Sequence, residues 1–249
     1  MFLTEGIRSL GRYMMLVGRT FRRPESGKEY WRAFMRDIDL LGFNSLPIVT
    51  VISLFVGAVV TIQTQFNLND PLVPEYYIAV ATRESMILEF SPTIISLILA
   101  GKVGSNIAST IGSMRVSEQI DALEVIGVNS AAFLILPKVL AMVIFNPVLI
   151  IISMFVGIFG GYLTALGGVI AVPDYLLGLQ TDFNPFFITY ALTKTVVFAF
   201  LIATISAYYG YYVKGGAIGV GINATKAVVS SSVAIIVANY ILTEFLLNV

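Results

Sequence analysis

Two residue types that enzymes often depend on are missing from this sequence: its 249 residues include no cysteine and no histidine. Without cysteine the chain has no disulfide and no thiol nucleophile, and without histidine it has no imidazole for a catalytic dyad or triad. Zinc sites built on these side chains are excluded too. Most familiar enzyme chemistries are therefore ruled out, and we expect no metal or other cofactor of the chain's own.

Charge is scarce as well. Charged residues make up 12% of the chain and the formal net charge is zero, so no broad cationic surface is available for a nucleic acid. In contrast, 57% of the residues are hydrophobic and the mean hydropathy is +0.87. One soluble core of this size needs far fewer apolar side chains. The composition indicates an integral membrane protein.

Residues 1–45 predict amphipathic helices that lie on a membrane surface. On a helical wheel the first stretch puts apolar residues on one face and arginines on the other. A second stretch, Lys28 to Leu41, carries Trp31, which suits the headgroup boundary. The alternative is a solvated helix on a soluble domain. The apolar face is Leu3, Ile7, Leu10, Met14, Val17 and Phe21, the basic face is Arg8, Arg12, Arg19, Arg22 and Arg23, and the break is Pro24, Ser26 and Gly27.

The rest of the chain predicts five spanning helices, because each crossing needs about 20 mostly apolar residues. We therefore expect an all-α integral membrane fold, with the N-terminal helices at 1–45 followed by a single transmembrane permease domain at 46–249. The spans run approximately from Leu46 to Gln65, Tyr76 to Ala108, Phe133 to Leu166, Phe186 to Val213 and Ala227 to Leu247.

The positive charges between spans predict the orientation, since cytoplasmic loops are enriched in Lys and Arg. The N-terminal segment and the loops at 102–138 and 214–226 carry Lys and Arg, whereas the loops at 67–75 and 167–184 carry only acids. We expect the N-terminus in the cytoplasm and the C-terminus on the outer side, which agrees with an odd number of spans.

Charged residues inside spans are costly and therefore informative. Arg83, Glu84 and Glu89 fall in the second span and Lys194 in the fourth. An unpaired ammonium at Lys194 would be unfavourable by several kcal/mol, so it needs a partner. Residue types alone leave two interpretations open: a Glu89–Lys194 ion pair that locks two helices, or a cavity that receives a polar headgroup. Arg83 and Glu84 fit an interfacial position equally well.

Small residues within the spans predict close helix contacts. One group surrounds Gly104 and Ala108, and another contains Gly157, Gly160 and Gly161. Because such spacing is common in spanning helices, the Gly157-x-x-x-Gly161 pattern favours ordinary packing within the chain over a specific dimer face.

The segment from Ser113 to Val128 is polar and predicts a short cytoplasmic helix. Ser117 is expected to cap it and Gly127 to end it. Acids and an amide would face solvent or a soluble subunit, while Ile120, Leu123 and Val125 would cover the membrane side. No phosphate-binding Gly-x-x-x-x-Gly-Lys-Ser/Thr motif occurs, so any ATP energy must come from another chain.

Two stretches stand out as motifs. They read AGKVGSNIASTIGSMRVSEQIDALEVIGV, from Ala100 to Val128, and GGAIGVGINATKAVVSS, from Gly215 to Ser231. Together they closely resemble the MlaE/YrbE permease family of ABC lipid transporters, including its chloroplast relatives. The string EQIDALEVIGV is specific, and the resemblance covers nearly the whole chain.

The resemblance implies a homodimeric permease of five spans that exchanges lipid between the inner membrane and a periplasmic MCE-domain protein. It also implies a cytoplasmic ABC ATPase subunit, which binds the ATP. This subunit would dock on the helix that carries EQIDAL. The ATPase-coupling residues implied in this way are Glu118, Gln119, Asp121, Ala122 and Leu123.

Two shorter matches imply a lipid-binding cavity. LEFSP, from Leu88 to Pro92, is similar to an RELGP-like segment of the family, and KTVVFA, from Lys194, is similar to a KxxxFG-like one. Glu89 and Lys194 are thereby assigned to the cavity, and Arg83 is added because Leu88 stands where the family usually has Arg. Two more departures are Thr110 for a usual Glu and Asn239 for a usual Asp.

We therefore expect the membrane permease subunit of an ABC-type phospholipid transporter in a bacterial inner membrane, and not an enzyme. The lipid species and the direction of transport stay open. The alternative is an ion-coupled secondary transporter or channel, in which Glu89 and Lys194 form a relay without any partner subunit.

Overall fold

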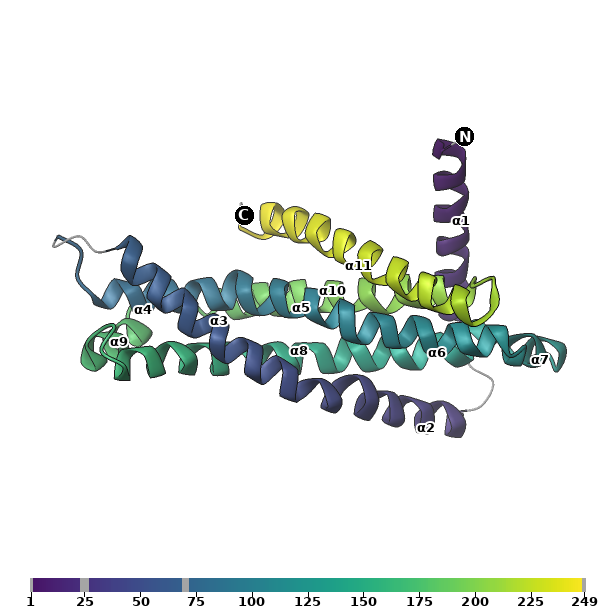
Figure 1. Cartoon of the computed structure of the whole chain (residues 1–249), viewed down its shortest axis with the longest axis horizontal. Helices are drawn as coiled ribbons and strands as arrows, with labels where there is room; N and C mark the ends of the chain where they lie inside the picture. The colour runs from purple at the N-terminus through teal and green to yellow at the C-terminus, as the bar shows by residue number, and fades with distance from the viewer. Residues whose placement is uncertain (1, 23–26, 69–71, 248–249) are drawn as a thin grey trace. The chain divides into compact units, whose positions relative to one another are not determined.

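The computed structural model describes residues 2–22, 27–68 and 72–247, with side chains from residue 6 onward. Over these residues it is helical with connecting turns and has no strand (Figure 1), which confirms the all-α prediction. The helices are α1 (Phe2–Thr20), α2 (Gly27–Asp37), α3 (Leu46–Asn67), α4 (Tyr76–Ser85), α5 (Ile95–Leu99), α6 (Ser105–Val116), α7 (Gln119–Val125), α8 (Ser130–Leu166), α9 (Val172–Gln180), α10 (Phe186–Tyr211) and α11 (Gly216–Leu247).

In the part of the chain that the structure describes, five helical stretches are long and apolar enough to cross a membrane, as predicted. The first two are built from several helices in sequence. α2 continues into α3 through a π-helical turn, and α4, α5 and α6 are joined by two π-helical segments, Met86–Ile94 and Ala100–Gly104. Pro92 lies in the first of these, where its missing N–H breaks the regular hydrogen-bond ladder. The five stretches are Gly27–Asn67, Tyr76–Val116, Ser130–Leu166, Phe186–Tyr211 and Gly216–Leu247.

The contacts within the chain define two compact units, neither of which is continuous in sequence. Unit 1 comprises Met1–Asn44, Leu97–Phe145 and Val197–Ala238. Unit 2 comprises Ser45–Ser96, Asn146–Val196 and Asn239–Val249. The predicted division into residues 1–45 and 46–249 stays a prediction, although α3 begins at Leu46.

In unit 1, α1 packs on the protein through one side and leaves its apolar face exposed. Leu16 and Thr20 are buried, and the hydroxyls of Tyr13 and Thr204 lie 2.8 Å apart in a hydrogen bond. Ile7 and Met14, from the predicted apolar face, are 71% and 63% exposed. This exposure suits a helix on a membrane surface, which stays a prediction. The predicted roles of Leu3, Arg23, Pro24 and Ser26 fall outside the described side chains.

In unit 2, α3 crosses α8 at glycines that let the two backbones touch. A Cβ added to Gly57 would overlap the carbonyl of Gly157, and one added to Gly160 would overlap the carbonyl of Leu54. Ser53 donates a hydrogen bond to Ser153 across the same contact, at 2.8 Å. The glycines of α8 therefore serve packing within the chain, which confirms the interpretation favoured from the sequence.

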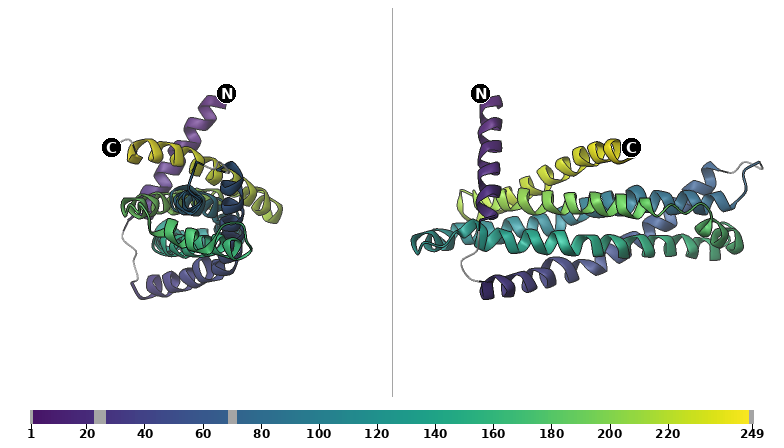
Figure 2. Two further views of the ribbon diagram at one scale, coloured as in Figure 1. Left: turned by 90° about the vertical axis from the view of Figure 1, so that its left-hand side faces the viewer. Right: turned by 180° about the vertical axis from the view of Figure 1, so that it is seen from behind.

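The short helices α4 and α9 also belong to unit 2 and lie side by side, as both Figure 1 and Figure 2 show. Gly178 makes the contact possible, because a Cβ there would overlap the carbonyl of Tyr76. Tyr175 is fully buried and donates a hydrogen bond to the carbonyl of Ile158 at 2.9 Å. The apolar cluster around it is Ile78, Ala79, Ala165, Ile170 and Tyr175.

The last span begins earlier than predicted. α11 starts at Gly216 and not at Ala227. The chain reverses at this start, where Gly215 and Gly216 have φ values of +93° and +65°. The glycines after Lys214 suggested a loop because glycine disfavours helix interiors. One of them, Gly219, is needed for close packing inside the helix, because a Cβ there would overlap the Lys214 carbonyl. The second span likewise runs past the predicted Ala108, to Val116.

We expect Gly57→Ala to lower the melting temperature of the purified protein in detergent. The added methyl group has no room between the two backbones, and overpacking of this kind costs about 1–3 kcal/mol. At about 2–4 °C per kcal/mol for a chain of this size, the shift is several degrees. Gly11→Ala is the matched control, because nothing lies within 4 Å of its added Cβ. Equal melting temperatures for the two variants would contradict the α3–α8 contact.

Candidate functional site

A buried ion pair joins two membrane spans in unit 2. The Nζ of Lys194, on α10, donates to Oε1 of Glu89 at 2.8 Å. The Lys194 side chain is 0% exposed, whereas that of Glu89 is 42% exposed. The prediction that Lys194 needs a partner is confirmed, and the partner is the carboxylate that the sequence suggested.

The ammonium group of Lys194 has further acceptors around it. Its Nζ lies 2.9 Å from the hydroxyl of Tyr190, 3.3 Å from the hydroxyl of Thr243 and 3.3 Å from the backbone carbonyl of Leu88. A buried charge is tolerated when its hydrogen-bonding capacity is met in this way. Leu88 thus contributes through its backbone, at the position where its side chain departs from the family pattern.

The carboxylate of Glu89 is held by donors from α11 and from its own segment. Asn239 donates to Oε2 at 3.1 Å, and Thr93 donates to the same oxygen at 3.1 Å. The Tyr190 hydroxyl donates to Oε1 at 3.3 Å. Three spans therefore converge on one polar group, which we call the Glu89–Lys194 cluster. Its members are Glu89, Thr93, Tyr190, Lys194, Asn239 and Thr243.

The sequence contains a spacing pattern that predicts the other members of this cluster, and our sequence-based prediction missed it. Thr93 follows Glu89 by four residues, Tyr190 precedes Lys194 by four, and Thr243 follows Asn239 by four. Residues four apart lie on the same face of a helix. Each polar pair thus marks the inward face of its span.

The structure does not bring Arg83 into the cluster. Its guanidinium is buried and donates to backbone carbonyls at the C-terminal end of α9, those of Gly178, Leu179 and Thr181 at 3.2, 2.9 and 2.8 Å. Carbonyls at a helix C-terminus have no partner within the helix, which makes them good acceptors for a cation. Among the described residues its only ion-pair partner is Glu84, at 3.5 Å. Arg83 thus ties α4 to α9, and the idea that it replaces an arginine at position 88 is wrong.

The short helix predicted within Ser113 to Val128, as the docking element for an ATPase subunit, exists as α7, Gln119–Val125. Its start differs from the prediction. Ser117 does not cap it: the Ser117 hydroxyl donates to the carbonyl of Ser113 at 2.9 Å. The turn into α7 is made by Glu118, whose φ is +60°. Gly127, with φ of +86°, follows the end of the helix as predicted.

The side chains of α7 are mostly exposed. Glu118, Gln119, Asp121 and Ala122 are exposed and Leu123 is partly exposed. Asp121 accepts a hydrogen bond from Arg115 at 2.6 Å, and Gln119 donates to Ser117. Val125 is 86% exposed and Ile126 is 71% exposed, so neither packs against the described protein, and the membrane-facing role of Val125 stays a prediction. Only Ile120 of the helix is buried.

Glu124 attaches α7 to the rest of unit 1. Its Oε1 accepts hydrogen bonds from Tyr211 at 2.8 Å, Ser130 at 2.9 Å and Arg19 at 3.2 Å. These contacts, the Tyr211 hydroxyl first, hold the pKa of Glu124 below its ordinary value, despite partial burial that acts in the opposite direction. Glu124 is one of the acids of this segment that the sequence predicts to face solvent or a soluble subunit, and it remains exposed while making these contacts.

Lys194→Met should destabilise the protein more than the double variant Lys194→Met/Glu89→Gln. The single change leaves a carboxylate inside the membrane spans without its cation, and breaking such a pair costs about 3 kcal/mol. Neutralising Glu89 as well removes the unpaired charge, so part of the loss is recovered. Melting temperatures in detergent measure both effects.

Arg32→Gln is the matched control for this series. It breaks an ion pair with Glu29 whose side chains are 72% and 52% exposed, and such pairs contribute less than about 1 kcal/mol. A Lys194→Met variant as stable as Arg32→Gln would show that the cluster does not hold the spans together.

Lowering the pH should release α7. Because the folded-state pKa of Glu124 lies below the ordinary value of 4.5, its stabilising contribution is complete above pH 4.5 and is lost as the pH falls through the folded-state pKa. Hydrogen exchange of α7 in the wild type and in Glu124→Gln, compared at each pH, measures this. Greater protection in the wild type is expected at neutral pH and should vanish in acid. A difference that does not change with pH would contradict the role of the carboxylate.

Comparison with known proteins gives one consistent result. The family described as Permease MlaE matches residues 34–245. A "Probable ABC transporter permease protein" of Rickettsia bellii is 37% identical over 221 residues, which cover 88% of this chain and 85% of the relative. "Protein TRIGALACTOSYLDIACYLGLYCEROL 1, chloroplastic" of Arabidopsis thaliana is 33% identical over 93% of this chain and 66% of its own.

A third relative has a more specific name. The "Intermembrane phospholipid transport system permease protein MlaE" of Haemophilus influenzae is 29% identical over 242 residues, 96% of this chain and 92% of the relative. The family match reaches into all five apolar spans and includes both motif-bearing segments noted in the sequence. This chain therefore belongs to the MlaE permease family, the membrane permeases of ABC-type transport.

Proposed function

We propose that this chain is the permease subunit of a phospholipid transporter and that the Glu89–Lys194 cluster contacts the lipid headgroup. The observation that carries the proposal is the unequal exposure of the ion pair. Lys194 is fully buried while the Glu89 side chain is 42% exposed, although both lie within membrane spans. A pair that served only to lock helices has no need to expose its carboxylate.

The chemistry of the cluster fits a headgroup that carries both a phosphate and an amine. The exposed part of Glu89 can accept from a headgroup amine, and the amide of Asn239 and the hydroxyls of Thr93 and Thr243 can donate to phosphate oxygens. The Haemophilus influenzae relative, named as a phospholipid transport permease, supports the same substrate class.

The energy for transport would come from a separate cytoplasmic ATPase subunit that docks on α7. Glu118, Gln119, Asp121, Ala122 and Leu123 are the coupling residues of this proposal. Exposed Val125 and Ile126 add an apolar contact of the kind that protein interfaces bury at their centre. ATP binding in the partner would shift α7, and Glu124 would pass the shift to α1 and α10.

We place the protein in a bacterial inner membrane. The basic loops favour an N-terminus in the cytoplasm and a C-terminus in the periplasm. There an MCE-domain protein would receive or deliver the lipid. A second copy of the chain would complete the permease. In keeping with a homodimer, the most apolar window of α11 is only 11% buried within the chain, against 33–50% in the other spans.

The test is a mild-detergent pulldown of the tagged protein, with mass spectrometry of the copurifying proteins and of the extracted lipids. We expect an ABC ATPase, an MCE-domain protein and phospholipid. Ile126→Glu should reduce the copurifying ATPase about tenfold, because it puts a charge into the proposed contact. Leu72→Glu, at an apolar residue on an acidic loop that is 89% exposed against 71% for Ile126, should leave the ATPase unchanged.

The double variant Lys194→Met/Glu89→Gln separates lipid binding from ATPase docking. It should lower the amount of bound phospholipid and keep the ATPase. Protein that purifies alone and without lipid, with transport that follows an ion gradient, would replace the proposal by the ion-coupled alternative. Lipid that stays at the wild-type level in the double variant would remove the cluster from the lipid path.

A further inference from the structure

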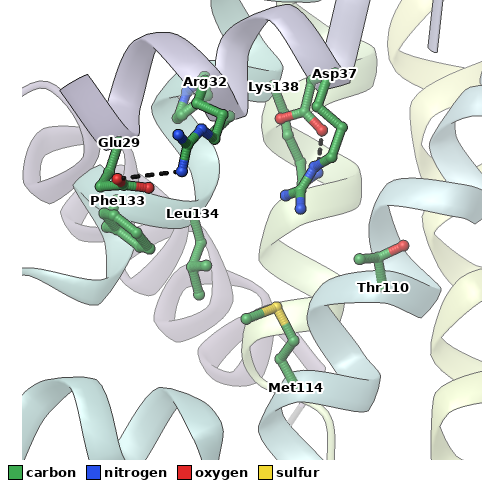
Figure 3. A pocket seen from close by; sticks show the side chains of 11 residues that line it. Glu29, Arg32, Asp37, Thr110, Met114, Phe133, Leu134 and Lys138 are labelled. Carbon is green, nitrogen blue, oxygen red and sulfur yellow. Dashed lines mark hydrogen bonds and ion pairs between the residues drawn. The ribbon is translucent and has the colours of Figure 1, made fainter. Parts of the chain in front are cut away.

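A second polar site lies in unit 1, in a cavity that shares no residue with the Glu89–Lys194 cluster. It has a volume of ≈ 330 Å³ and is formed by α2, α6 and the start of α8. Figure 3 shows the side chains that surround it. Volumes of about 300–1,000 Å³ are typical of sites for small ligands. The lining residues that bear on the argument are Glu29, Arg32, Ala33, Arg36, Asp37 and Lys138.

One wall of the cavity is a buried ion pair between α2 and α8. The Nζ of Lys138 donates to the carboxylate of Asp37 at 2.7 Å, and the two side chains are only 7% and 3% exposed. In Figure 3 they meet beside the cavity. The pair joins residues 101 positions apart in the sequence. It ties α2 to α8 and so fixes the shape of the wall.

Two arginines of α2 supply positive charge at the cavity. Arg32 and Arg36 are four residues apart, hence on one face of the helix, and both are exposed. Arg32 has only the exposed Glu29 as its partner, at 3.5 Å, and Arg36 has none among the described residues. Because the lining holds three cations and two carboxylates, it carries one net positive charge. Guanidinium groups with free donors suit a phosphate, which they bind through two N–H groups at once.

The remaining walls of the cavity are apolar, and the outward face of α2 exposes aromatic and apolar side chains. Met114, Phe133 and Leu134 line the cavity, with Thr110 as a neutral hydroxyl. The outward face of α2 exposes Trp31 by 60% and Met35 by 52%. An exposed tryptophan on an amphipathic helix that continues into a span is typical of the membrane–water boundary. A ligand of this cavity would thus have its charge at headgroup level and apolar groups beneath it.

We propose that this cavity binds the phosphodiester headgroup of an anionic glycerophospholipid from the leaflet next to the basic loops. Arg32 and Arg36 hold the phosphate, and the apolar wall receives the glycerol end of the acyl chains. Basic pockets between spanning helices on this side of a membrane are a known way of recognising anionic headgroups. The site differs from the Glu89–Lys194 cluster in carrying net positive charge, and its occupation does not depend on transport.

The single tryptophan of the chain, Trp31, is next to Arg32 and reports on this site. The purified full-length protein is placed in mixed vesicles of phosphatidylglycerol and phosphatidylcholine, one of which carries brominated acyl chains that quench tryptophan. We expect the wild type to prefer phosphatidylglycerol about fivefold or more around Trp31, and Arg32→Gln/Arg36→Gln to lower this preference to near one.

Two further variants test whether the lipid preference comes from the cavity or from general attraction between basic surface residues and anionic lipid. Arg22→Gln/Lys28→Gln removes two exposed basic residues nearby that do not line the cavity, and it should keep the preference. Ala33→Leu fills the cavity without changing any charge and should abolish the preference for phosphatidylglycerol. The emission maximum of Trp31 and the melting temperature check that each variant is folded.

Three outcomes would overturn the proposal. One is equal quenching by both lipids in the wild type. Another is that Arg22→Gln/Lys28→Gln lowers the preference as much as Arg32→Gln/Arg36→Gln does, or that Ala33→Leu leaves the preference intact. Either result would assign the lipid preference to general attraction by the basic surface. The third is loss of the preference on adding millimolar inorganic phosphate, which would make the ligand a soluble anion. None of these outcomes bears on the headgroup role of Glu89 and Lys194.

Discussion

One buried ammonium group constrains the arrangement of unit 2. Lys194 lies in a span where no water is available to solvate it, so every one of its donors must find an acceptor in the protein. Those acceptors come from the π-helical segment around Glu89 and from α11 as well as from α10 itself. A shift of any of these helices by a single residue would remove at least one of these acceptors. The position of Lys194 thus fixes the register of three spans.

The same principle acts a second time in unit 1. Lys138 is buried against Asp37, and the two side chains are only 7% and 3% exposed. Apolar packing does not distinguish well between helix registers inside a membrane, because lipid tails are as apolar as leucine. Polar contacts do distinguish them, since a wrong register leaves a charge or a donor unsatisfied. In this chain the few charges decide which helices meet, and the glycines decide how closely.

The sequence predicted the features that depend on single segments, and it failed where a partner segment decides. Five spans and the need of Lys194 for a partner follow from hydropathy and from the cost of a buried charge. The position of the Arg83 side chain does not, because its acceptors are backbone carbonyls at the C-terminal end of α9, which no side-chain pattern marks. The start of α11 was placed too late because its glycines look like a loop until their packing is known.

The two proposed lipid sites would select headgroups by different physical means. In the Glu89–Lys194 cluster the charges cancel, so a headgroup there gains little from net attraction and must replace existing hydrogen bonds with its own. Such a site discriminates by the placement of donors and acceptors, because an unmatched group costs more than a matched one contributes. The cavity beneath α2 keeps one positive charge and two exposed arginines, so it discriminates first by charge and less by shape. A lipid that carries both charges, such as one with a phosphate and an amine, suits the first site, whereas a lipid with net negative charge suits the second.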